Sequence, residues 1–381
     1  MKVLQLWLGS GAVLLALLIV AGCSSQLSTA PTDTTGRVFS PPIHVNFTRA
    51  GVAYTPAQVR QAYGLTALPA TNTGAGQTIA IVDAYGSPTI QKDLNTFCST
   101  FSLPATTISI VYPGGKPSGT NSGWALETAL DVEWAHAVAP GAKILLVVSP
   151  SDYDAPLMQA VDYAARNAGQ VSMSWGGPED PTLIPLDSHF AVPGVTFLAA
   201  SGDSGAGAEW PASVPTVVGV GGTTLTLDRT NNRLQETGWS YSGGGQSAIE
   251  PIPAFQTLWQ TSRLRQTPDV SYNADPNTGF RVYDTTRYSG YSGWFVVGGT
   301  SAGAPQWAGL IAIANSLRTT RLANANATLY KLGTPTAFPT QLVDIISGNN
   351  GSYTAGVGYD MVTGLGSPRA NLLIPALVAA R

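Results

Sequence analysis

The glycine-rich stretch 298–309, Gly-Gly-Thr-Ser-Ala-Gly-Ala-Pro-Gln-Trp-Ala-Gly, most constrains what this chain can fold into. The apolar run Trp294–Val297 before it predicts a buried strand, and the pattern after it predicts a helix that ends near Arg318. Ser301 is therefore expected at a tight corner between strand and helix, with Pro305 in the first helical turn, where proline is tolerated. Such a corner offers unpaired N–H groups and a positive field that stabilise an oxyanion. The stretch predicts a serine nucleophile, although a serine that only caps a core helix gives a similar pattern.

Apolar runs alternate with helical patterns through the first half of the chain, from residue 52 to residue 220. Strands that are apolar throughout and alternate with helices are typical of a parallel sheet with helices on both faces. Between residues 223 and 297, shorter runs among Gly, Ser, Asn and Pro predict long loops and β-hairpins. We expect one α/β domain over residues 52–381. The predicted strands are 77–82, 143–148, 171–175, 195–200 and 216–220, and the predicted helices are 54–63, 93–101, 126–138 and 158–167.

The composition narrows the class of partner. Charged residues are 11% of the chain, well under the roughly 25% of ordinary soluble proteins. A net charge of -3 and the lack of any basic cluster argue against nucleic acid, and we expect a monomer. Because there are few carboxylates to protonate, the composition also predicts that stability changes little as pH falls.

The N-terminal segment reads as a targeting signal. The apolar run 11–21 is shorter than the roughly 20 residues of a spanning helix, and it leads into Val-Ala-Gly-Cys at residues 20–23. These four residues resemble a bacterial lipobox, which implies a signal peptide over residues 1–22 and lipidation of Cys23. The chain is then expected outside the cytoplasm, anchored by lipid to a bacterial membrane, in the periplasm or at the cell surface. A plain secretory signal is the alternative. Residues 23–51 are predicted to be a tether or linker.

A serine nucleophile needs a proton acceptor, and the three histidines are poor candidates. Gly-Thr-Ser-Ala-Gly at residues 299–303 fits the G-x-S-x-G pattern of α/β-hydrolases, but their histidine follows the serine and no histidine follows Ser301. Subtilisin-type enzymes need a histidine that opens a helix in a His-Gly-Thr turn, and neither His44, His136 nor His189 has that context. A base at His136 stays open as an alternative, and it predicts an optimum near neutral pH.

Two carboxylates are better candidates for the base. Glu127 and Asp131 are four residues apart in a predicted helix, so they share one face. Each disfavours ionisation of the other, and a pair that shares a proton supplies a general base in mildly acidic water. A solvated acidic helix face is the ordinary alternative for this spacing.

Three motifs together resemble the sedolisin family: Glu-x-x-x-Asp at 127–131, Ser-Gly-Asp-Ser-Gly at 201–205, and Gly-Thr-Ser-Ala-Gly-Ala-Pro at 299–305. The resemblance extends from about residue 54 to residue 368. It implies a subtilisin-like parallel sheet with helices on both faces, a single catalytic domain with a C-terminal calcium loop, and acid-active peptidase chemistry. It also implies that Ser301 is the nucleophile, Glu127 the base, Asp131 its support, and Asp203 a protonated oxyanion donor.

The resemblance implies further sites around this centre. The segment Ser174, Trp175 and Gly176 is expected to be a strand edge that binds a substrate peptide by backbone pairing. Asp83 is expected behind the catalytic groups, linked to them through Trp175. One Ca²⁺ ion is expected in the C-terminal loop, because aspartates and glycine-exposed carbonyls supply hard oxygen ligands. Its implied ligands are the carboxylates of Asp344 and Asp360 and the backbone oxygens of Ile345, Gly356 and Gly358.

The sequence departs from the family in two respects. Only the residues between Cys23 and about Tyr54 are available for a prodomain, fewer than the roughly 50 residues of a small domain. A lipid anchor is also not a general family trait. We expect a lipid-anchored, exported peptidase that cleaves polypeptide substrates through an acyl-enzyme. The alternative is a catalytically silent, calcium-stabilised surface binding protein with a peptidase fold.

Overall fold

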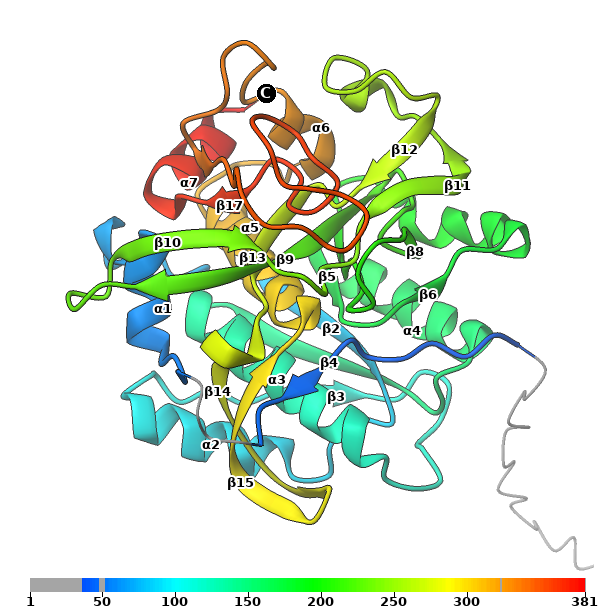
Figure 1. The fold of residues 1–381 in the computed structure, drawn as a ribbon. Helices are drawn as coiled ribbons and strands as arrows, with labels where there is room; N and C mark the ends of the chain where they lie inside the picture. Colours follow the sequence, from blue (N-terminus) through cyan, green and yellow to red (C-terminus); the bar gives the residue numbers. More distant parts are fainter. Residues whose placement is uncertain (1–35, 48–51, 323, 381) are drawn as a thin grey trace, which may run out of the picture. The chain divides into compact units, whose positions relative to one another are not determined.

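An eight-stranded, largely parallel sheet lies at the centre of the fold in a computed structural model that describes residues 36–47, 52–322 and 324–380. Its strands are β2 (Thr78–Ala84), β3 (Ser109–Val111), β4 (Lys143–Ser149), β5 (Gln170–Met173), β7 (Thr196–Ala200), β9 (Val217–Leu227), β10 (Arg233–Gly238) and β13 (Val270–Asn273). The strand order is β10-β9-β7-β5-β2-β4-β3, with β13 also paired to β9. Every pairing is parallel except that of β10 with β9 at one edge (Figure 1).

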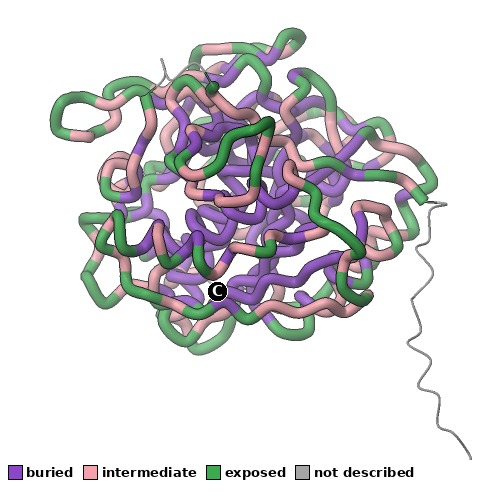
Figure 2. Tube along the Cα trace, turned by 90° about the horizontal axis from the view of Figure 1, so that it is seen from below, coloured by how far each residue is buried: buried purple, intermediate pink, exposed green. Residues whose placement is uncertain are grey.

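The central strands are buried on both faces, as their uninterrupted apolar sequences predict. In β2, Ile79 and Ile81 pack into one core, whereas Ala80 and Val82 pack into a second core on the opposite face. This alternation follows from the two-residue period of a strand. Buried residues accordingly fill the middle of the domain in Figure 2, and exposed residues lie around it.

Helices cover both faces of the sheet, so the predicted parallel sheet with helices on both faces is confirmed. The helices α1, α2, α3, α5, α6 and α7 contribute to the core that holds Ile79, and α4 contributes to the core that holds Val82. Helix α1 starts with Pro56 after Thr55, whose capping box with Gln58 is the pattern expected of a helix start. The bounds are α1 (Pro56–Ala62), α2 (Ile90–Phe101), α3 (Ser122–Val138), α4 (Asp154–Asn167), α5 (Gly303–Ser316), α6 (Ala325–Tyr330) and α7 (Ala370–Ala379).

Short strands and hairpins lie around the sheet, and some of them come from residues 223–297, for which the sequence predicts hairpins. Strands β10 and β13 of that stretch instead join the central sheet. One difference is β9, which continues to Leu227 instead of ending near residue 220, because β13 and β10 pair with its second half. The shorter strands are β1 (His44–Val45), β6 (Gly177–Pro178), β8 (Glu209–Trp210), β11 (Gly245–Pro251), β12 (Leu264–Thr267), β14 (Phe280–Tyr288), β15 (Tyr291–Gly298), β16 (Leu342–Val343) and β17 (Ser367–Pro368).

Part of the predicted linker is packed onto the domain. Residues 37–46, which we call the N-terminal strap, run from α4 to the hairpin of β14 and β15 (dark blue in Figure 1). The strap buries Phe39 to 2% exposure, and β1 at its end pairs with β15. The predicted signal peptide and Cys23 lie outside the described residues. Among the described residues, no helix has the length and apolar character needed to cross a membrane.

Candidate active site

Ser301 lies at the corner that the sequence predicts. Strand β15 ends at Gly298, Gly299 has a φ of 120°, and a 3-10 turn over Thr300–Ala302 leads into α5. Glycine is required at 299, because a Cβ there would collide with the carbonyl oxygen of Pro42 and with Oδ2 of Asp203. The same collision shows that three distant segments of the chain meet beside Ser301.

Glu127 and Asp131 are fully buried on α3, so the reading of a solvated acidic face is wrong. Helix α3 packs against α5 and against the turn that holds Ser301. The hydroxyl of Ser174 lies 2.8 Å from Oδ1 of Asp131 and 3.2 Å from the backbone oxygen of Ser301, and its single hydrogen can be donated to either. Ser174 therefore ties the carboxylate pair to the turn of the predicted nucleophile.

The carboxyl groups around Ser301 hold their protons more tightly than usual. Burial raises the pKa of Glu127 well above its ordinary value, and the nearby charges of Asp131 and Asp83 raise it further. Burial and the charge of Asp83 likewise raise the pKa of Asp131. Burial raises the pKa of Asp83 to about 7. One proton shared among these groups leaves a carboxylate that can accept another from Ser301.

The hydroxyl of Ser301 interacts with two partners. It lies near enough to Glu127 to lower the pKa of that carboxyl, against the larger effect of burial. Its one well-aligned hydrogen bond is donated to the backbone oxygen of Pro42 at 2.8 Å. Neither carboxyl oxygen of Glu127 has a hydrogen-bond partner of good geometry among the described residues. Glu127 is thus an unpaired acceptor beside a hydroxyl that already contacts a peptide carbonyl.

Asp203 follows β7 and faces the same peptide carbonyl. Its Oδ1 accepts hydrogen bonds from the N–H and the hydroxyl of Thr300, each at 2.8 Å, while Oδ2 has no hydrogen bond within the described part of the chain. Burial raises the pKa of Asp203 well above its usual range, and the charge of Glu209 adds to this effect. His44 Nε2 lies 3.5 Å from Oδ2. A protonated Asp203 can donate a hydrogen bond to a carbonyl oxygen next to Ser301.

The predicted substrate edge is paired, and its partner is the strap. Gly176 donates its N–H to the oxygen of Ser40 and accepts the N–H of Ser40, each at 3.2 Å, in an antiparallel bridge. Trp175 is buried, but it does not link Asp83 to the site as expected. Its indole N–H donates to the backbone oxygen of Val82 at 2.8 Å, and an indole has only this one donor.

The histidines do not supply a base for Ser301. His136 Nε2 lies 2.7 Å from the backbone oxygen of Pro104, and His189 Nδ1 lies 2.7 Å from Oδ1 of Asp162. Burial lowers the pKa of His136. Among the described residues, no histidine forms a hydrogen bond with Ser301, so the geometry favours the carboxylates.

In the C-terminal loop, each aspartate expected to bind calcium contacts one of the expected glycines. Asp344 Oδ2 accepts the N–H of Gly358 at 2.9 Å, and Asp360 Oδ2 accepts the N–H of Gly356 at 3.1 Å. The backbone oxygens of Ile345, Gly356 and Gly358 accept no hydrogen bond from the described part of the chain. No group of three or more His, Cys, Asp or Glu side chains suited to a metal occurs among the described residues. Two carboxylates with backbone carbonyls and water fit Ca²⁺, which prefers hard oxygen ligands.

Three residues that contact Ser301 or Asp203 were not predicted from the sequence: Pro42, His44 and Thr300. Thr300 could have been found, because it stands next to Ser301 in the same motif. No local signal marks Pro42 or His44, since the sequence separation between Pro42 and Ser301 is 259 residues.

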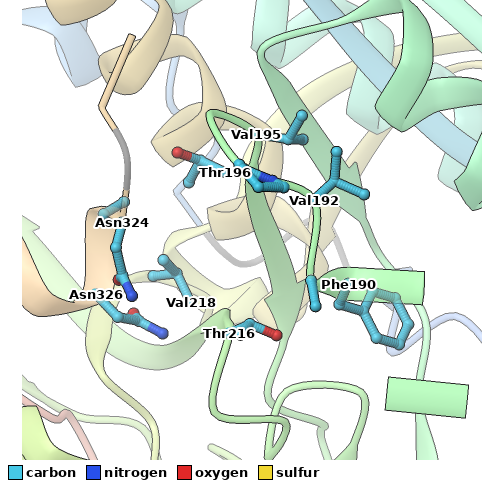
Figure 3. A pocket seen from close by; sticks show the side chains of 11 residues that line it. Phe190, Val192, Val195, Thr196, Thr216, Val218, Asn324 and Asn326 are labelled. Carbon is cyan, nitrogen blue, oxygen red and sulfur yellow. The ribbon is translucent and has the colours of Figure 1, made fainter. Parts of the chain in front are cut away.

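A separate pocket of about 240 Å³ lies at the opposite end of the sheet (Figure 3). Thr196 opens β7, Val218 is near the start of β9, and Asn324 caps α6. Ligands of parallel α/β sheets bind at the carboxyl ends of the strands, where Asp83, Ser174 and Asp203 lie. This pocket contains none of the predicted site residues.

Known proteins resemble this chain over most of its length. The Peptidase_S8 model, described as the subtilase family, matches residues 113–344. Kumamolisin of Bacillus sp. (strain MN-32) is 35% identical over 375 residues, which cover 86% of this chain and 64% of kumamolisin. The chain belongs to the sedolisin family. Sedolisin of Pseudomonas sp. (strain 101) is 30% identical over 366 residues, covering 84% of this chain and 60% of that protein.

The fold of this family member matches a solved relative. Pseudomonas sedolisin, a serine-carboxyl proteinase complexed with two molecules of pseudo-iodotyrostatin, superposes with a TM-score of 0.75 at 27% identity. The match covers 86% of this chain and 97% of that chain. The chain spans less than two thirds of the length of the curated relatives named above.

Proposed function

We propose that this chain is an exported, acid-active serine-carboxyl peptidase that hydrolyses peptide bonds through an acyl-enzyme. The observation that carries the proposal is the hydroxyl of Ser301 between a peptide carbonyl and a buried carboxylate pair. Membership of a family of peptidases supports the same reaction class.

In the proposed reaction, Ser301 Oγ attacks the carbonyl carbon of a bound peptide. Glu127 takes the hydroxyl proton, and Asp131 shares that proton through its contact with Glu127. Negative charge develops on the carbonyl oxygen, and the protonated carboxyl of Asp203 donates a hydrogen bond to it. Glu127 then gives its proton to the leaving amine. Water completes the cycle by attacking the acyl-enzyme with the same groups.

Activity at acidic pH follows from the protonation states that this reaction needs. Asp203 must be neutral to donate, and the pair of Glu127 and Asp131 must hold one proton. Burial raises the pKa of all three carboxyls, so these states are populated in acidic water and are lost as pH rises.

Peptide hydrolysis at about pH 4 by the wild type and by Ser301→Ala tests the proposal. We expect Ser301→Ala to lose at least roughly 10³-fold in kcat. A matched control is Ser99→Ala, an exposed serine on α2 that should keep full activity. A mechanism-directed label should react with Ser301 in the wild type. Equal activity in the wild type and Ser301→Ala would refute the assignment.

We also propose that Cys23 carries a lipid that anchors the enzyme to a bacterial membrane outside the cytoplasm. The Val-Ala-Gly-Cys sequence at residues 20–23 supports this proposal. Cys23→Ser should move the enzyme from the membrane fraction to the soluble fraction while its activity is retained.

A calcium ion in the C-terminal loop is the final part of the proposal. Asp344 and Asp360 would hold it through their carboxylates, and Ile345, Gly356 and Gly358 through backbone oxygens. The ion would stabilise the loop, and the catalytic residues lie elsewhere.

A further inference from the structure

We propose that Asp93, Glu133 and Asp284 form a proton-dependent latch that holds the hairpin of β14 and β15 against α2 and α3 in acid and releases it near neutral pH. The three carboxyls are positioning residues, because they act on Ser301 through the hairpin and do not touch a substrate. The inference rests on the proposed peptidase function and deepens it, because release of the hairpin sets an upper pH limit for the peptidase.

The three carboxyl groups of the latch come from three different elements. Asp93 lies on α2, Glu133 on α3 and Asp284 on β14, and each is fully buried. Helices α2 and α3 both pack against β14 (Figure 1). None of the three carboxyls takes part in an ion pair within the described residues. Burying such groups without a cation is unfavourable unless protons neutralise them.

The hydrogen bonds around Asp93 and Asp284 indicate which carboxyl carries a proton. Asp93 accepts from the hydroxyl of Thr89 at 2.5 Å, and from the N–H and the hydroxyl of Thr285 at 3.1 and 2.8 Å. Asp284 Oδ1 accepts the N–H of Thr286 at 2.8 Å, whereas Oδ2 is buried without a partner among the described residues. The Asp284 carboxyl lies within hydrogen-bonding reach of Asp93. A proton on Asp284 therefore completes a hydrogen bond to Asp93.

Glu133 joins the hairpin to the helix of the catalytic carboxyls. Its Oε2 accepts the N–H of Tyr283 on β14 at 3.1 Å, and its Oε1 has no hydrogen bond to any described residue. The same helix carries Glu127 and Asp131. Strand β14 pairs with β15, which ends just before the turn that holds Ser301. The latch therefore holds the strand that leads to the nucleophile against the helix of the base.

The latch loses its protons as pH rises toward neutrality. Burial raises the pKa of Asp284 to about 6, and the charge of Asp93 adds to this effect. Burial, together with the charges of Asp93 and Asp284, raises the pKa of Glu133 well above its ordinary value. Because folding raises these pKa values, the stability that the protons contribute is fully present in acid and is lost as pH rises from about 6 upward.

The hairpin is the part that can give way. Strands β14 and β15 form a three-stranded sheet with β1, separate from the central sheet. Deprotonation leaves like charges buried beside one another, and movement of β14 into water relieves both their repulsion and their desolvation. The central sheet keeps its own hydrogen bonds when the hairpin moves, so the opening is local.

Other titratable groups near the latch do not neutralise it. Cys98 on α2 faces Glu133, and burial raises the pKa of its thiol to about 11, so the thiol stays neutral. His136 lies one turn further along α3, but its Nε2 is 2.7 Å from the backbone oxygen of Pro104, and burial lowers its pKa. The exposed cations of α2 and β14 form no ion pair with the latch within the described residues, and they are Lys92, Arg281 and Arg287.

Amide hydrogen exchange on the full chain with Ser301→Ala tests the latch without self-cleavage. Between about pH 5 and about pH 7.5, protection factors in β14 and β15 should fall at least roughly tenfold more than those in β4. Adding Asp284→Asn should remove this excess, because an amide donates to Asp93 at any pH. The control Asp228→Asn changes an exposed carboxyl just after β9 and should leave the excess unchanged.

A second variant protects the test from a folding defect at Asp284. Glu133→Gln keeps an oxygen that can accept the N–H of Tyr283 but carries no charge, so it should also remove the excess. With Ser301 intact, the half-life of peptidase activity during incubation at about pH 7.5, assayed after return to about pH 4, should lengthen at least roughly fivefold in either latch variant.

Two results would overturn the proposal. One is an equal fall of protection in β14, β15 and β4 on the Ser301→Ala chain, which decides the matter even if neither latch variant folds. The other is an excess fall that persists in both Asp284→Asn and Glu133→Gln. Neither result depends on turnover, so the peptidase assignment is judged separately, and equal peptide hydrolysis by the wild type and Ser301→Ala would remove it.

Discussion

Two kinds of buried carboxyl group in this protein are built in opposite ways. Asp269 is fully buried and fully paired: its two oxygens accept from Arg265 at 2.9 and 2.6 Å, from Tyr330 at 2.9 Å and from the N–H of Gly219 at 2.8 Å. Glu127 and Asp83 are equally buried, yet none of their oxygens has a well-aligned partner among the described residues. Neither Glu127 nor Asp83 forms an ion pair within the described residues.

The difference separates a structural carboxylate from a reactive one. A buried charge with a guanidinium and further donors keeps its charge and holds its neighbours in place. Buried carboxyls without a cation are instead driven toward the neutral form, which costs stability and raises their pKa. Such arrangements are enriched at functional sites, and Glu127 lies beside Ser301.

Changing the fully paired carboxylate, Asp269, should cause the greatest loss of stability. Asp269→Asn removes the charge and leaves the Arg265 guanidinium buried and unpaired, so the free energy of unfolding should fall by about 3–5 kcal/mol. Denaturant unfolding measures the loss. A change below about 1 kcal/mol would show that the two carboxyl sets do not differ in the way described.

Glu127→Gln should lower activity without lowering stability, the reverse of what is expected for Asp269→Asn. Activity on a peptide at about pH 4 should fall roughly 100-fold or more, because the acceptor of the Ser301 proton is lost. The free energy of unfolding should be unchanged or higher, since an amide carries no charge into the core. Parallel kinetic and unfolding measurements on both variants test the contrast, and a destabilised but active Glu127→Gln chain would reverse it.

The pH dependence of stability is a further test of the difference between paired and unpaired buried carboxyls. Folding raises the pKa of Asp83 to about 7 and raises the pKa of Glu127, Asp131 and Asp203, so the folded state binds more protons than the unfolded state above the ordinary carboxyl pKa. The free energy of unfolding is then greatest in acid and falls as pH rises from about 4 to about 7, by roughly 3 kcal/mol or more. The weak pH dependence expected from composition overlooks these buried groups. Calorimetry with a chelator present should show a lower Tm at the higher pH, and Glu127→Gln should reduce that difference.

Calcium removal should have the smallest effect. Free calcium at about ten times its Kd stabilises a one-site protein by roughly 1.4 kcal/mol, so chelation near neutral pH should lower the Tm by a few degrees. Asp360→Asn should remove most of the response to chelator. An unchanged Tm in the wild type would contradict the proposed ion.

The local structure of this protein follows from short stretches of its sequence. Uninterrupted apolar runs predict the parallel strands, the 3.6-residue period places Glu127 and Asp131 on one face of α3, and the glycines around Ser301 predict the corner before α5. These features depend on backbone hydrogen bonds and on side chains within a few residues of each other, so residues close together in the sequence are enough to specify them.

Which distant groups meet depends on how the elements pack in three dimensions. It buries the acidic face of α3, turns the Trp175 indole toward Val82 instead of Asp83, and lays the strap across Ser301 with Phe39 between two tryptophans. Burial and contact at these places depend on how whole elements pack, and the raised pKa values depend on that burial. No short stretch of sequence carries that information, because each contact joins segments that packing alone brings together.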